Sequence, residues 1–197
     1  MNRPLQNRVL ATGDIVAHPA RGRFMGNRGI LHDADRQLGR ARWRHKAWVT
    51  CRLVWKDWHR EVMTPGAYTE LFFLDEAVAL AAGHRPCGLC RHGDYMAFRK
   101  AAGVDGPVDR LDRILHAQRA VPRRAQQRRE TLEADALPDG TIILDGLPKL
   151  LLGDRMYPVR VDGYDAPELR KTGPVTVLTP ALSRQALSNG YKAQIAL

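Results

Sequence analysis

The stretch that decides the fold runs from residue 68 to residue 91 and reads YTELFFLDEAVALAAGHRPCGLCR. Aromatic and aliphatic side chains dominate its first six positions, which predicts a strand. Asp75 has the chemistry of a helix N-cap, and the alanine-rich run after it predicts a helix through Ala82 with Gly83 as its stop. Two cysteines follow closely. A strand, a short helix and a cysteine pair joined by tight turns indicate an α+β fold around a cysteine-rich site.

The residues on either side of this stretch extend the same fold. Ranges 23–31 and 48–55 are short β-rich segments bounded by turn residues, and with 68–73 they predict a small antiparallel sheet. Helices are predicted over 91–102, where a glycine follows, and over 108–119, where apolar residues recur at helical spacing. We therefore expect helices packed around the sheet and the cysteine-rich site.

The second half of the chain changes character. Segment 119–130 is nearly all polar and contains Pro122, which predicts an exposed basic connector. From residue 138 onward, short apolar runs alternate with Asp-Gly and Gly-Asp turns and predict a β-meander or small barrel, with a strand over 175–178 and a helix over 180–188. The predicted organisation is a zinc-binding α+β domain over 1–105, a basic helix and connector over 106–135, and a smaller β-rich unit over 136–197.

The three cysteines point to a metal. Cys87 and Cys90 stand three residues apart at the start of a predicted helix, where two thiolates can face one tetrahedral ion. Strand alternation places Cys51 on the same face as Val49, which we expect to be the buried face, so Cys51 can join them. The alternatives are that Cys51 is an ordinary buried residue and that the pair is a redox motif. We predict a zinc ion, structural in preference to catalytic, on all three.

The fourth zinc ligand is open at this level. His84 is our first candidate because it completes a His-x-x-Cys-x-x-Cys pattern, and His92 and His59 are further candidates. A water molecule in the fourth position would make the ion a catalyst instead.

The chain from about residue 51 to residue 91 resembles the zinc-binding N-terminal domain of Ada-type DNA alkylation-repair proteins. The shared pattern is an aromatic strand, a short Glu-Ala-rich helix and the run Ala-Gly-His-Arg-Pro-Cys-Gly-Leu-Cys, with His in place of the usual aromatic residue. The resemblance implies that Cys87 and Cys90 are ligands, that Cys51 with Arg52 stands for one member of the family's first cysteine pair, and that a DNA backbone is the partner. The missing second member implies a zinc module without the family's methyl transfer. The remainder resembles bacterial proteins without an assigned function.

The charge is concentrated in two blocks. The 197 residues carry a formal net charge of +10 with a pI near 10.1. Residues 1–60 hold +9 (13 basic, 4 acidic) and residues 106–130 hold +4 (7 basic, 3 acidic), whereas 61–105 and 131–197 hold −2 and −1. Of the 31 basic residues, 25 are arginines, whose planar guanidinium suits phosphate. We expect a nucleic-acid partner, DNA in preference to RNA; the alternative is a solvated basic face that reflects coding bias.

Several residues are candidates for that contact. Four tryptophans fall within residues 43–58 among basic side chains, a mixture that suits stacking on bases. Strand parity places Trp55 with Cys51 and leaves Trp48 as the better stacking candidate, although alternate tryptophans could instead form the core. The predicted nucleic-acid contacts are Arg28, Arg42, Arg44, Trp48, Arg52, Arg85, Arg91, Arg119, Arg123 and Arg124.

Two enzyme classes remain as alternatives, and whether the chain is an enzyme is left undecided. His59-Arg60-Glu61 with Pro86-Cys87-x-x-Cys90 matches the signature of zinc nucleobase deaminases, but a Pro-Gly pair interrupts the helix that the signature requires. A nuclease could use His32 and Asp33 or His116 as its catalytic residues. The alternative is that His32 and Asp33 are ordinary turn residues at the tip of a β-hairpin, without a catalytic role.

Composition excludes several classes. With 44% hydrophobic and 26% charged residues the chain can form a core, which excludes disordered and collagen-like proteins. No apolar run approaches the roughly 20 residues of a membrane-spanning helix, and the first 16 residues lack the apolar centre of a secretory signal. We expect no membrane partner and a cytoplasmic location.

Overall fold

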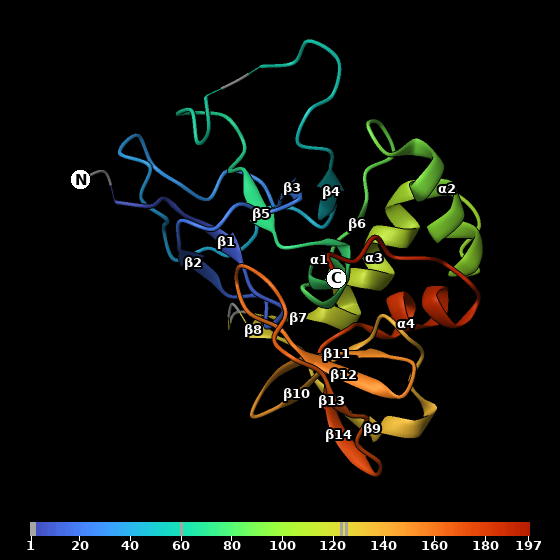
Figure 1. Ribbon diagram of the computed structural model, residues 1–197. Coiled ribbons are helices and arrows are strands. Elements are labelled where there is room, and N and C mark those ends of the chain that lie inside the picture. Colours follow the sequence, from blue (N-terminus) through green and yellow to red (C-terminus); the bar gives the residue numbers. More distant parts are fainter. Residues whose placement is uncertain (1–2, 60, 123, 125) are drawn as a thin grey trace.

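The computed structural model describes residues 3–59, 61–122, 124 and 126–197, and it has an α+β architecture. The first sheet has the strand order β2-β1-β5-β3-β4-β6 (Figure 1). Three of its pairings are antiparallel, as expected, and two, β1 with β5 and β4 with β6, are parallel, so the sheet is mixed. The six strands are β1 (Gln6–Val9), β2 (Ile15–Ala17), β3 (Phe24–Asn27), β4 (Val49–Cys51), β5 (Leu71–Phe73) and β6 (Arg85–Pro86).

Helix α1 (Glu76–Ala81) lies at the centre of the molecule (Figure 1). As predicted, Asp75 caps it, because its carboxylate accepts the backbone N–H of Val78 at 3.0 Å. Gly83 follows the helix at a φ of 83°, a left-handed conformation that suits glycine. Every residue of α1 is buried, which explains why small alanines alternate with larger apolar residues: elements pack on all its sides.

Three longer helices form a layer beside α1. The expected helices are present as α2 (His92–Ala101), α3 (Val108–Arg119) and α4 (Ala181–Ser188). Their apolar faces meet in one cluster that includes Phe98 of α2, Leu115 of α3 and Ala186 of α4. None of the helices in the described part of the chain is long and apolar enough to cross a membrane.

The second sheet confirms the β-rich character of the C-terminal unit. Its strand order is β13-β12-β11-β10-β14-β9, and β10, β11 and β12 form the expected meander. A short 3₁₀ helix (Ala134–Ala136) follows β9. The strands are β9 (Glu130–Glu133), β10 (Ile142–Asp145), β11 (Leu147–Leu152), β12 (Arg155–Pro158), β13 (Glu168–Leu169) and β14 (Pro174–Val177).

The basic connector is not a free arm. Residues Ala120–Val121 (β7) and Gln126–Gln127 (β8) form a small hairpin. The side-chain amide of Gln127 donates to the backbone carbonyls of Ala81 and Leu178, which fixes the hairpin against α1 and the end of β14. This anchoring gives Arg128 and Arg129, which follow the hairpin, a defined position on the molecule.

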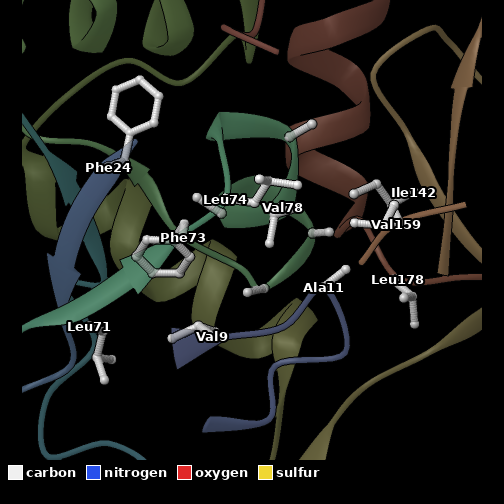
Figure 2. Close-up of a cluster of buried hydrophobic side chains, with 14 of the residues drawn as sticks. Val9, Ala11, Phe24, Leu71, Phe73, Leu74, Val78, Ile142, Val159 and Leu178 are labelled. Atoms are coloured by element: carbon white, nitrogen blue, oxygen red, sulfur yellow. The ribbon is translucent and has the colours of Figure 1, made fainter. Parts of the chain in front are cut away.

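The two sheets share one core (Figure 2). Val9 and Phe73 from the first sheet, Val78 from α1, and Ile142 and Leu178 from the second sheet belong to a single buried cluster. The segment after α4 also returns to α1, because the backbone N–H of Gln194 donates to Glu76 at 2.9 Å and that of Ala196 donates to Asp75 at 2.9 Å. Helix α1 is thus the element on which both halves of the chain are assembled.

Candidate metal centre and basic cavity

The three cysteines gather at one point. Parallel pairing of β4 with β6 brings the ends of the two strands level, and the N–H of Cys87 donates to the carbonyl of Thr50 at 2.9 Å. Cys90 follows in the turn before α2. The sulfur atoms of Cys51, Cys87 and Cys90, here called the cysteine cluster, all lie within 4.8 Å of one another and are half-buried. Three thiolates at this separation can hold one metal ion.

Local hydrogen bonds prepare the cluster for negative charge. The backbone N–H of Leu89 donates to the sulfur of Cys87 at 3.4 Å. Hydrogen bonds from the Cys51 and Cys90 thiols lower the pKa of Cys87, whereas the bond to Cys87, with burial, raises the pKa of Cys51. The Cys87 thiol therefore loses its proton most readily, whereas Cys51 keeps its proton because it donates a hydrogen bond within the cluster and is partly buried. A cation can take the place of the shared protons, so the donor set fits a thiophilic divalent metal.

His84 does not belong to the cluster, which corrects our first candidate for the fourth ligand. Its ring is fully buried on the core side, 4.6 Å from the Phe73 ring and 5.4 Å from the Trp48 ring between centroids. Backbone pairing explains this orientation, since the N–H of His84 donates to the carbonyl of Ala79 at the end of α1. His92 is exposed and bonds to the carbonyl of Gly88 at 3.0 Å. Among the described His, Cys, Asp and Glu residues, only the three cysteines form such a group.

The faces of β4 are reversed relative to the sequence prediction. Trp48 and Thr50 are buried, at 2% and 1% exposure, whereas Cys51 is half-buried and Leu53 is 50% exposed. Trp48 is therefore a core residue and not a stacking platform for bases. Cys51 still meets the other cysteines because the half-exposed face of β4 is the face that the turn before α2 covers.

Two predicted phosphate contacts are internal ion pairs instead. Arg85 is 4% exposed and forms a two-pronged pair with Asp112 of α3 at 2.7 and 2.8 Å. Arg91 is 2% exposed and bonds to Glu76 at 2.8 Å and to Asp94 at 2.9 Å. Both guanidiniums are used to hold helices together, so they are not available to a nucleic acid.

Arg28 and Arg119 are also buried, but without a carboxylate partner. Their carbon atoms Cζ lie 4.2 and 4.0 Å from the centroid of the Trp48 ring. Within the described part of the chain, their hydrogen-bond acceptors are backbone carbonyls and the Nε2 atom of His84. Burial lowers the pKa of Arg28 to about 9 and lowers that of Arg119 as well. Neither side chain lies on the open surface where we had predicted it.

The two basic blocks meet at one hollow. A cavity of about 780 Å³, here called the basic cavity, lies between the β1–β2 turn, α3 and the β7–β8 hairpin. Arg28 and Arg42 come to it from the first block, and Arg128 and Arg129 from the second. Arg28 and Arg42 were predicted contacts, whereas Arg128 and Arg129 were expected only as part of the exposed basic connector, and the turn residue Asp14 was not predicted. The described residues that line the cavity are Thr12, Gly13, Asp14, Arg28, Arg42, Trp48, Ala117, Gln118, Val121, Gln126, Gln127, Arg128, Arg129 and Glu130.

The remaining predicted contacts differ in position. Arg44, Arg52 and Arg124 are exposed, and Arg42 is half-buried at the basic cavity. Arg52 and Arg91 line a second, smaller hollow of about 340 Å³. Arg123 lies outside the described residues.

The enzyme candidates do not assemble into a site. His32 is buried and its ring bonds to the Thr69 hydroxyl at 2.6 Å, while the Asp33 carboxylate accepts backbone N–H groups of its own turn, which is the hairpin-tip interpretation. His116 instead packs its ring against Trp43 and Trp48. The deaminase pattern also fails, because Glu61 forms an exposed ion pair with Arg36 and His59 is exposed outside the cysteine cluster.

Comparison with protein-family models, with curated proteins and with solved structures returned no match. The site is therefore interpreted from its own geometry.

Proposed function

We propose that this protein holds one zinc ion in the cysteine cluster and binds nucleic acid at the basic cavity. The observation that carries the proposal is that arginines from the two basic blocks meet at one cavity. Arg42 and Arg128, which both line it, are more than 80 residues apart in the chain. A basic concavity built from distant segments is an arrangement expected of a phosphate-rich partner.

Zinc is the metal that suits the donor set best. Three thiolates select a soft or borderline ion over magnesium or calcium, and zinc accepts three sulfurs with one further ligand. The resemblance to Ada-type zinc modules supports the same ion on Cys51, Cys87 and Cys90. We infer a structural role, because the ion would tie β4 to the turn that starts α2. The described residues leave its fourth position to a small exogenous ligand such as water. That ligand does not by itself make the ion a catalyst, because no described His, Asp or Glu belongs to the cluster to exchange a proton with it.

The zinc proposal is tested by metal content and by cobalt substitution. Elemental analysis of the purified protein should give one zinc per chain, and Co²⁺ in its place should produce an intense sulfur-to-cobalt absorption band. Cys87→Ser should remove the band, while His92→Ala, which alters an exposed neighbour outside the cluster, should keep it. A protein that takes up neither metal contradicts the proposal.

The nucleic-acid proposal is tested by salt dependence. Binding of labelled single-stranded and duplex DNA and of RNA should weaken steeply between about 50 and 200 mM salt, since each phosphate contact releases counterions. The double variant Arg128→Gln/Arg129→Gln should bind more weakly and lower the slope of log K against log salt by about one per arginine removed from a phosphate.

The matched control for that variant lies on the second sheet. Arg155→Gln/Arg160→Gln removes the same charge from exposed positions away from the basic cavity, where the side chains are 45% and 50% exposed. Its affinity should stay close to that of the unmodified protein. Equal losses in the two double variants would mean that net charge alone attracts the nucleic acid.

A further inference from the structure

We infer that the basic cavity receives the terminal phosphate monoester of a nucleic acid, with Arg28 as the recessed group that contacts it. This inference rests on the proposed function, and it narrows the partner from a phosphate backbone in general to a phosphorylated end. Three features of the cavity support it: buried arginines without an ion-pair partner at its base, further arginines at its opening, and the burial of Arg28 below the surface.

The base of the cavity holds positive charge that no described carboxylate pairs directly, although Asp14 attracts Arg28 and Asp112 attracts Arg119 through space. Arg28 lines the cavity although it is only 2% exposed, and Arg119 lies behind it against the same Trp48 ring. The Nε atom of Arg119 and the Nδ1 atom of His84 are buried without a hydrogen-bond partner in the described structure. Buried charges are ordinarily paired, so a site that concentrates two guanidiniums, neither of them in an ion pair with a described carboxylate, has the electrostatics of an anion receptor.

The charged groups around the opening favour an anion as well. Arg42, Arg128 and Arg129 lie in the cavity lining. The two acidic side chains there, Asp14 and Glu130, each already accept a hydrogen bond from another residue. Asp14 accepts the Thr12 hydroxyl at 2.7 Å, and Glu130 pairs with Arg184 at 2.6 Å. Four arginines against two carboxylates leave the lining net positive.

Depth distinguishes a chain end from a chain interior. An internal phosphodiester carries a sugar on each side, so it contacts arginines that stand on an open surface. Arg28 does not stand there: it is buried, and its guanidinium is held by the carbonyls of Gly13 at 3.2 Å and Ala82 at 3.4 Å. A terminal phosphate has one free side and up to two negative charges, so it can enter a recess of about 780 Å³ with part of its nucleotide.

Binding of matched oligonucleotides tests the inference. One sequence is compared with a 5′-phosphate, with a 3′-phosphate and with hydroxyl groups at both ends, and inorganic phosphate and a nucleoside monophosphate are measured in parallel. We expect one of the two phosphorylated forms to bind at least about tenfold more tightly than the form without a terminal phosphate, a factor within the range of one charge-assisted contact. Arg28→Lys, which keeps the charge and loses the fork, should reduce that preference.

Two further variants keep the test decisive. If Arg28→Lys fails to fold, Arg128→Ala at the exposed rim replaces it, and Arg155→Ala is the matched control that should retain the preference. Equal binding of all three oligonucleotides would overturn the terminal-phosphate inference and leave the proposed function intact. Binding of inorganic phosphate or the monophosphate as tightly as the phosphorylated oligonucleotide would overturn both, because the rest of the nucleic acid would then add nothing and the cavity would serve a small anion.

Discussion

The two ends of helix α1 bury opposite charges and satisfy them differently. At its start, Asp75 and Glu76 accept hydrogen bonds from Tyr164 and Tyr191 at 2.6 Å each, and Arg91 adds an ion pair to Glu76. At its end, Arg28 donates to the carbonyl of Ala82 and Arg119 donates to that of Gly83, and neither forms an ion pair with a described carboxylate. Both arrangements suit the helix dipole, which is positive at the start and negative at the end.

The two ends of helix α1 therefore have different roles: the acidic end stabilises the fold, and the basic end is suited to binding a ligand. The acidic end is closed, since every carboxylate oxygen has a partner. Asp75 Oδ1 accepts from Val78 within the helix, and the other three oxygens accept from distant parts of the chain, so this end holds the two halves together. The basic end leaves buried nitrogen atoms unpartnered and opens toward the basic cavity. A fully paired buried charge stabilises one packing, whereas an unpaired one costs stability that a ligand can restore.

The largest expected effect is at the acidic end. Glu76→Ala leaves Arg91 buried with only Asp94 as a carboxylate partner, and it also frees the Tyr191 hydroxyl and the Gln194 N–H. We expect a loss of about 3–5 kcal/mol in the free energy of unfolding, measured by urea titration. Asp109→Ala breaks only the exposed pair with Arg113 and should cost less than about 0.5 kcal/mol. Similar costs for the two variants would contradict the comparison.

The second-largest loss of stability is expected for Gly83→Ala. The residue has a φ of 83°, and an added Cβ would lie 2.5 Å from the Cδ atom of Arg119. Left-handed backbone costs about 1–2 kcal/mol for an alanine, and displacement of Arg119 adds to it. Gly146→Ala, at a φ of 68° with nothing within 4 Å of its Cβ, separates the backbone cost from the contact. Thermal unfolding should show the larger loss for Gly83→Ala.

Alkaline pH should weaken the acidic end in particular. Burial and the neighbouring Glu76 carboxylate raise the pKa of Tyr191 above its usual value of 10.0, and Tyr164 beside Asp75 shifts in the same direction. The folded protein thus holds these protons more tightly than the unfolded chain, so their contribution is complete below pH 10 and is lost as the pH rises above it. Urea titrations from pH 8 to 11 should show this loss, and Tyr191→Phe should make it shallower. Tyr157→Phe, whose hydroxyl has no carboxylate partner in the described structure, should leave it unchanged.

The smallest expected effect is at the basic end. Arg119→Met removes a buried charge that has no carboxylate partner, and the relief of desolvation offsets the two backbone hydrogen bonds that are lost. We expect a change within about 1 kcal/mol of zero. Arg91 is similarly buried but is ion-paired with Glu76. Arg91→Met should therefore lower the free energy of unfolding several times more, because it leaves the buried Glu76 carboxylate without its ion-pair partner. Equal costs for the two methionine variants would mean that Arg119 is as well compensated as Arg91.

Local signals in the sequence were sufficient for the helices. The Asp75 cap, the Gly83 stop and the 108–119 helix could be predicted because capping, left-handed glycine and apolar spacing act within a few residues. The cysteine cluster was also within reach, since Cys87 and Cys90 are neighbours in sequence and Cys51 was the one remaining cysteine.

The rest depended on partners far away in the chain. Residues 48–51 are tryptophan, valine, threonine and cysteine, so each face of that strand carries an apolar side chain. Alternation alone therefore could not show which face would be buried under α2 and α3. Charge counts likewise treat every arginine alike. Asp112 lies 27 positions after Arg85, and only folding shows that this arginine is paired while Arg28 is not.

The return of residues 191–196 to helix α1 has a consequence for the order of events during synthesis. The contacts of Tyr191, Gln194 and Ala196 with the acidic pair span 115 to 121 residues of chain. While the ribosome is still making the second sheet, the carboxylates of Asp75 and Glu76 have not met these partners, and the first sheet lacks the part of its core that Ile142, Leu150, Val159 and Leu178 supply. Folding therefore completes late and as a single event, and a nascent chain that stalls before residue 191 should remain a substrate for chaperones.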